Sequence, residues 1–235
     1  MPKINFENRI LLGITDGKGL HCRAEEKLEA LNKLKIKKAA LFLEELDQAE
    51  RKKIYRALLD STLKKIPLCH VRNDMEVEEF VFLESKFKTK YFTIHENSFG
   101  FLDKWPGFEK KLYLEMNTDD YISPKVKIEK IGGFCVDLSH FKVALISWTK
   151  EFDYTYIKRN KSKFTCNHLN GYDWKKNTDM HTVKNVKDFN YLETLPKFIF
   201  SKVIALEMYN SIAEQIKFKN YLKKMLGEYF NRKIQ

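Results

Sequence analysis

The sequence predicts an α/β protein of the (β/α)₈ TIM-barrel class, formed as a single domain over residues 1–235. Three observations lead to this fold. Eight short apolar or β-branched runs recur along the chain, segments with helical periodicity lie between most of them, and the runs begin about 20 to 40 residues apart, which leaves room for a crossover helix. Such spacing forces parallel pairing, and eight parallel βα units favour a closed barrel.

The eight predicted strands have buried, strand-like compositions with few interruptions. In chain order they are RILLGIT (9–15), KAALFLEEL (38–46), IPLCH (66–70), KYFTIHE (90–96), KLYLEMN (111–117), GFCVDLSH (133–140), FTCNHLN (164–170) and KVIALEMYN (202–210).

Helices are predicted between the strands from apolar spacing and from start signals. Ala24, Leu28, Leu31 and Leu34 repeat at helical intervals, and so do Ile212, Ile216, Met225 and Leu226. Asp47 with Glu50, and Ser211 with Glu214, have the spacing of a capping box. An open doubly wound sheet is the alternative, but GITDGKG after the first run does not match the glycine-rich phosphate motif of that fold.

Composition narrows the classes of function. Hydrophobic residues make up 43% and charged residues 32%, no run is long enough to span a membrane, and MPKINFENR lacks the apolar core of a signal peptide, so a cytoplasmic protein is expected. The cysteines show no metal-site or redox spacing, which predicts reduced and mostly buried thiols at Cys22, Cys69, Cys135 and Cys166. The net charge of +11 favours an anionic partner, such as nucleic acid or a phosphorylated small molecule, and a merely solvated basic surface is the alternative of equal weight.

Ionisable residues recur where the predicted strands end, which is the end of a parallel barrel that carries the chemistry. They are His70, His95 with Glu96, Glu115, Asp137 with His140, His168 and Glu207, with His181 in the loop after the seventh strand and His21 standing apart. Each alone can be structural, with a Glu paired to a Lys or a His bonded to a carbonyl. Several carboxylates at one rim need positive charge among them, and the share of histidines favours Zn²⁺ or Mn²⁺ over Mg²⁺ or Ca²⁺. Cys135 and Cys166 are expected to pack deeper in the barrel instead of binding metal.

These endings resemble the xylose isomerase-like TIM-barrel superfamily, and most closely the endonuclease IV type of apurinic/apyrimidinic endonuclease. The motifs VDLSH, NHLN, TDMH and ALEM carry the resemblance, which spans about residues 66–210. It implies a cluster of up to three zinc ions held, in chain order, by His70, His95, Glu115, Asp137, His140, His168, Asp179, His181 and Glu207. It further implies a monomer that cleaves DNA at abasic sites, with Glu115 bridging two ions and Glu115 and Glu207 as catalytic residues that orient the nucleophile.

The sequence also departs from that family. GITDG, VRND after His70, and HLNG replace family motifs that grip DNA, while IHENSFGFLDK and EMNTDD also look like the related UV-damage endonucleases. Arg72, Lys175 and the basic run 157–163 are candidates for phosphate contacts or are solvated charges, and Trp105 and Trp174 either stack on bases or cover the core.

Two alternatives stay open. The first is a sugar or sugar-phosphate isomerase or epimerase of the same superfamily, which needs one Mn²⁺ or Mg²⁺ held by Glu115, Asp137, His168 and Glu207. The second is a protein that binds metal or nucleic acid without catalysis.

Overall fold

The computed structural model describes residues 5–17, 23–159 and 163–232 and contains the predicted parallel barrel. The strands follow one another around the sheet in the order β1-β11-β8-β7-β6-β5-β4-β3-β2, and every neighbouring pair in it is parallel. Their bounds are β1 (Ile10–Leu11), β2 (Gly13–Ile14), β3 (Ala40–Phe42), β4 (Leu68–His70), β5 (Tyr91–Ile94), β6 (Leu112–Leu114), β7 (Gly133–Asp137), β8 (Phe164–Leu169) and β11 (Val203–Leu206). All eight predicted strands are therefore confirmed, since β1 and β2 are two halves of the first one.

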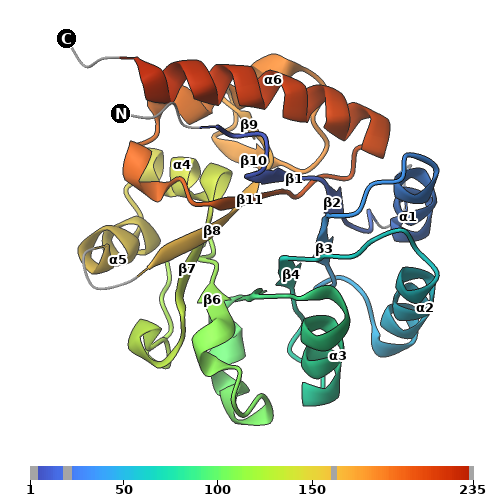
Figure 1. Ribbon diagram of the computed structural model, residues 1–235. Helices are drawn as coiled ribbons and strands as arrows, with labels where there is room; N and C mark the ends of the chain where they lie inside the picture. Colours follow the sequence, from blue (N-terminus) through green and yellow to red (C-terminus); the bar gives the residue numbers. More distant parts are fainter. Residues whose placement is uncertain (1–4, 18–22, 160–162, 233–235) are drawn as a thin grey trace.

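The helices pack around the outside of this sheet (Figure 1). They are α1 (Ala24–Lys33), α2 (Gln48–Leu59), α3 (Val77–Phe87), α4 (Leu138–Ser147), α5 (Lys150–Lys158) and α6 (Ile212–Asn231). Short 3₁₀ helices are η1 (Glu96–Gly100), η2 (Leu102–Lys104), η3 (Glu109–Lys111), η4 (Ile128–Lys130), η5 (Val186–Thr194) and η6 (Lys197–Ile199). A separate antiparallel hairpin, β9 (Gly171–Asp173) with β10 (Thr178–Met180), follows β8.

Both predicted capping boxes are present. The side chains of Asp47 and Ser211 accept hydrogen bonds from the N3 backbone of α2 and α6, and Glu50 and Glu214 bond back to the capping residues. One helical prediction is wrong in detail, because Leu34 follows the end of α1 and is 53% exposed instead of facing the core.

The barrel closes at Gly13. The chain changes partner there, with β1 pairing with β11 and β2 pairing with β3. A Cβ at Gly13 would lie 1.8 Å from the carbonyl oxygen of Leu206, so this close approach requires glycine. Gln215 of α6 secures the closure, since its side-chain amide donates to the carbonyl of Gly13 and its side-chain oxygen accepts from the Gly13 amide.

The barrel interior is a small apolar cluster separate from the larger core beneath the helices. It contains Leu11, Ala40, Phe42, Leu68, Tyr113, Cys135, Cys166 and Ala205. Cys69, Cys135 and Cys166 are buried free thiols, as predicted, while Cys22 and His21 lie outside the described residues. Among the described residues, no helix is long and apolar enough to cross a membrane.

Candidate metal centre

Strand alternation places the ionisable side chains directly above the interior cluster. Side chains two positions apart on a strand point to the same side, so the residue two positions after an interior residue faces the barrel mouth. The pairs are Phe42 and Glu44, Leu68 and His70, Tyr113 and Glu115, Cys135 and Asp137, Cys166 and His168, and Ala205 and Glu207. The polar set therefore gathers at the carboxyl end of the strands, as predicted.

The deepest group consists of Glu115, Asp137, His168 and Glu207, whose ligand atoms all lie within 4.8 Å of one another. Nδ1 of His168 is 2.8 Å from Oε2 of Glu115 and 3.1 Å from Oε2 of Glu207. The other ring nitrogen of His168 bonds to the Thr93 hydroxyl at 3.2 Å. The contact with Thr93 thus fixes the orientation of the ring, with Nδ1 facing the carboxylates. Ligand histidines are usually oriented in this way.

Asp137 is fixed by its neighbours at the start of α4. Its Oδ1 accepts hydrogen bonds from the backbone amides of Ser139 and His140, and from the Ser139 hydroxyl. The amide of Asn170 donates to Oδ2. The carboxylate therefore has a set orientation in the barrel mouth before any ligand arrives.

A second group forms around His70. Its Nδ1 lies 3.6 Å from oxygens of Glu44, Glu115 and Glu207. The ring centroid of His95 is 4.8 Å from that of His70, yet His95 belongs to none of the groups whose ligand atoms lie within 4.8 Å of one another.

A third group lies nearer to solvent and consists of His140, Asp179 and His181. Nε2 of His181 is 3.1 Å from Oδ2 of Asp179, while its Nδ1 is 3.2 Å from the carbonyl oxygen of Glu207. The hairpin β9–β10 supplies Asp179 and leads directly into His181. His140 stands between this group and the deep one, with Nδ1 3.6 Å from Oε1 of Glu115.

Unpartnered atoms test whether a metal fits these residues. Buried polar groups are normally hydrogen-bonded, and an unsatisfied one costs about 1–3 kcal/mol. Among the described residues, buried atoms of the centre without a hydrogen-bond partner include Glu44 Oε2, His70 Nδ1 and Nε2, and His95 Nδ1. Nitrogen and carboxylate oxygen donors left free in this way fit divalent metal ions.

The electrostatics also favour positive charge at the centre. Burial alone would raise the pKa values of Glu115 and Glu207, but the neighbouring His168 holds both below the ordinary value. Burial would lower the pKa of His168, but the same two carboxylates raise it. The deep group therefore stabilises a cation between its acids, which is the role a metal ion takes.

The outer group also favours positive charge. Burial opposes a charged His181, but its contact with Asp179 raises the pKa of the imidazole to about 10. The same contact lowers the pKa of Asp179 to about 2. His95 differs, because burial lowers its pKa to about 4.

The structure adds Glu44, which the sequence reasoning missed. The signal was present, since Glu44 follows the interior residues Ala40 and Phe42 at the same alternating interval. The predicted second strand ends at residue 46, whereas β3 ends at Phe42, so Glu44 does not stand at the end of the predicted strand.

An open groove of about 370 Å³ borders the centre and contains Arg72. It is lined by Glu44, Val71, Arg72, Asn73, Asp74, His95, Asn97 and Ser98. Nε of Arg72 lies 3.4 Å from Asp74, and the arginine side chain stays 39% exposed. The predicted phosphate contact Arg72 thus stands beside the centre.

Other predicted contact residues lie elsewhere. Lys175 is an exposed residue in the turn between β9 and β10. The described part of the basic run lies at the end of α5 and directly before β8, so it is at the amino end of the strands, opposite to the centre, which favours the alternative of solvated charges.

The two tryptophans differ. Trp105 is fully buried, and its indole donates to the carbonyl of Met75, so stacking on bases is excluded and the core-covering alternative holds. Trp174 is 51% exposed in the hairpin turn, with Nζ of Lys142 4.9 Å from its ring centroid.

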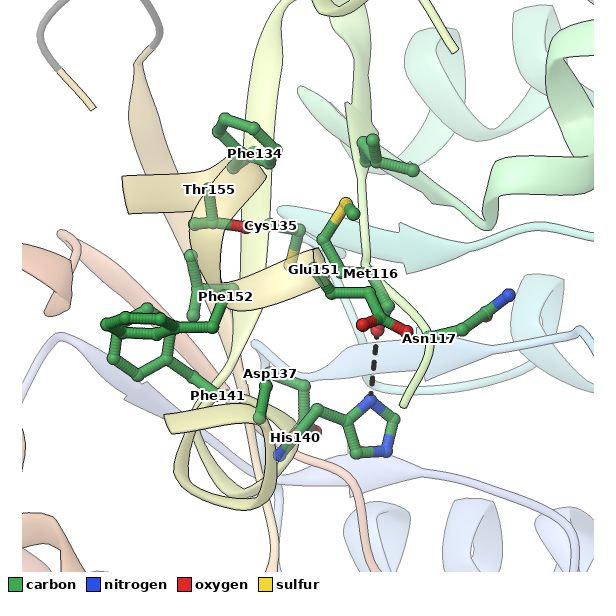
Figure 2. Close-up of a pocket in the computed structure, with 13 residues that line it drawn as sticks. Met116, Asn117, Phe134, Cys135, Asp137, His140, Phe141, Glu151, Phe152 and Thr155 are labelled. Carbon is green, nitrogen blue, oxygen red and sulfur yellow. Dashed lines mark hydrogen bonds between the residues drawn. The ribbon is translucent and has the colours of Figure 1, made fainter. Parts of the chain in front are cut away.

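A small pocket of about 20 Å³ lies on the other side of His140 (Figure 2). Asp137 at the end of β7 and His140 of α4 reach its edge, and Nδ1 of His140 is 3.3 Å from the carbonyl oxygen of Met116. Glu151, at the start of α5, turns its carboxylate into the pocket, and neither oxygen has a hydrogen-bond partner among the described residues. The pocket has room for about one water molecule between these groups.

Comparison with known proteins gives little beyond this geometry. No protein-family model matches the sequence, and no curated protein matches it significantly. Among solved structures, that of SacUVDE, a UV-damage endonuclease, has a TM-score of 0.48 and 13% sequence identity, and the match covers 93% of this chain and 99% of that chain. At that score the likeness carries no argument about activity.

Proposed function

We propose that the chain is a single-domain, metal-dependent phosphodiesterase with a multinuclear zinc site, which cleaves DNA at abasic sites. The observation that carries the proposal is the outer group of His140, Asp179 and His181, which converges beside a separate buried group. Two such groups suit a cluster of ions, and a cluster suits phosphoryl chemistry because it stabilises both the attacking and the leaving oxygen.

The rival function is sugar or sugar-phosphate isomerisation or epimerisation with one Mn²⁺ or Mg²⁺. The deep group of Glu115, Asp137, His168 and Glu207 meets that need by itself. An isomerase with one ion does not require the outer group, in which Asp179 and His181 are in contact. The outer group therefore favours the phosphodiesterase.

The residues divide into roles that follow from their positions. Glu115 turns one oxygen to His168 and the other to His140, which suits a carboxylate shared between two ions. Glu207 connects the groups, because its carboxylate lies beside His168 and its carbonyl oxygen beside Nδ1 of His181. Bound metal would lower the pKa of a water molecule and neutralise charge on the phosphate.

DNA is the proposed substrate because of charge and shape. The chain carries a net charge of +11, and the groove beside His70 contains Arg72. On the hairpin, the exposed Trp174 offers a stacking surface next to Lys142 and Lys175. The resemblance to endonuclease IV points to the same class of substrate.

Metal analysis and an incision assay test the proposal together. We expect about three zinc ions per chain and incision of a duplex that contains one abasic site. Asp179→Asn should lose about one ion and most of the activity, because it removes a charged ligand of the outer group. Asp173→Asn, on the partner strand of the same hairpin, should retain the full number of ions and the activity.

The outcomes separate the candidate functions. About one manganese ion per chain together with ketose epimerisation would establish the rival. Protein that carries all its metal ions and leaves abasic DNA intact would exclude this substrate.

A further inference from the structure

Glu44 is an acidic residue that faces both the metal centre and the open groove. It lies two residues after the end of β3, and its side chain is 22% exposed. Its Oε2 is nevertheless buried and has no hydrogen-bond partner in the part of the chain that the structure describes. One side of the carboxylate is therefore enclosed by the centre while the residue lines the groove that contains Arg72.

The spacing around His70 is that of metal ligands and not that of hydrogen bonds. Nδ1 of His70 lies 3.6 Å from Oε2 of Glu44 and 3.6 Å from Oε1 of Glu207. Hydrogen bonds between such atoms are about 2.7–2.9 Å long. Ligand atoms about 2.1 Å from a tetrahedral ion are about 3.4 Å apart, which is close to the spacing observed.

Other roles for Glu44 leave its buried oxygen unexplained. Among the described residues, no lysine or arginine forms an ion pair with it, and Arg72 in the same groove contacts Asp74 instead. The imidazole of His70 is 1% exposed, and neither of its nitrogens has a hydrogen-bond partner. A buried imidazole and two carboxylates that face one another without hydrogen bonds are held together best by a cation.

We propose that Glu44 is a metal ligand, which binds the same ion as His70 and Glu207. The nine-residue order implied by the resemblance has no counterpart to Glu44, so the resemblance does not imply this ligand. The proposal rests on the proposed metal centre. It places a carboxylate of this chain on the side of the ion that faces the groove, where substrate would approach.

Metal binding by Glu44→Gln tests the proposal, with Glu45→Gln as the matched control. Glu45 is the next residue and is exposed, so both variants lose one negative charge from the same loop. We expect Glu44→Gln to weaken the binding of one ion at least about 10-fold in a chelator competition, and to change the visible absorption of the cobalt-substituted protein. Glu45→Gln should match the wild type in both measurements.

The outcomes distinguish this inference from the proposed function. Wild-type protein that binds no metal would overturn both. Wild-type protein that binds its ions, with Glu44→Gln equal to it in affinity and cobalt spectrum, would overturn the role of Glu44 alone. If circular dichroism shows that Glu44→Gln is unfolded, Glu44→Asp replaces it. Its shorter side chain should weaken the binding of the same ion.

Discussion

Arg51 shows how single side chains stabilise the barrel outside the metal centre. Its guanidinium is fully buried and donates two hydrogen bonds to Glu79, at 2.9 Å and 3.0 Å, and one to Asp74 at 2.8 Å. The Tyr55 hydroxyl also donates to Glu79. This network ties α2 to α3 and to the loop that precedes α3.

Replacing Glu79 should destabilise the fold in a pH-dependent way. Glu79→Gln leaves the buried Arg51 with one anion fewer, which costs about 3 kcal/mol. Burial would raise the pKa of Glu79, but its bonds from Arg51 and Tyr55 hold it below 4.5. The stabilisation is therefore full above the pKa of the unfolded state and is lost as the pH falls through the folded pKa.

Urea unfolding at about pH 7 and about pH 3 measures this difference. The gap between wild type and Glu79→Gln should narrow at the lower pH. The exposed Glu78→Gln serves as a control and should unfold like the wild type at both. A gap that is equal at the two pH values would contradict the ion-pair explanation.

At the scale of elements, the approach of the first strand to the last depends on one glycine. Gly13→Ala should destabilise the protein by about 3 kcal/mol or more, because the added methyl group meets the backbone of Leu206 and the neighbouring backbone cannot move aside as a side chain would.

A glycine-to-alanine substitution in α6 is expected to have the opposite effect on stability. A Cβ at Gly227 would meet nothing within 4 Å, and Gly227→Ala in a helix interior should stabilise by about 1 kcal/mol. Thermal unfolding of the two variants compares them directly. Equal and small effects would show that β2 moves freely relative to β11.

The elements were predictable because the strands are short, mostly buried runs, and six of them end at an ionisable residue. That pattern located six of the carboxyl ends well enough to identify His70, Glu115 and His168 as neighbours. It missed Glu44, because the predicted second strand ran on to residue 46 and so ended beyond this residue. The position of the basic run 157–163 was not predictable, because charge alone does not say at which end of the barrel a segment lies.

For the whole molecule, the proposed metal centre would connect function to stability. Three carboxylates, Glu115, Asp137 and Glu207, are almost completely buried within one group. An ion that binds only the folded state at a concentration about 1,000-fold above its Kd adds about 4 kcal/mol. Chelation should therefore lower the Tm by about 8–16 °C in a chain of this size.

Differential scanning calorimetry with and without chelator measures this shift. Re-addition of zinc should restore the Tm, and Asp179→Asn should show a smaller drop than the wild type because it holds fewer ions. An unchanged Tm in the wild type would mean that the acids are stable without metal.

The seam at Gly13 also bears on the order in which the barrel can form during synthesis. Gly13 and Gln215 are hydrogen-bonded across 202 positions of the chain, and Glu207 follows β11, the last strand of this sheet along the chain. A nascent chain that ends before β11 has a gap in its sheet and lacks this carboxylate. The group of Glu115, Asp137, His168 and Glu207 can therefore be complete only once β11 and the residue that follows it have been made.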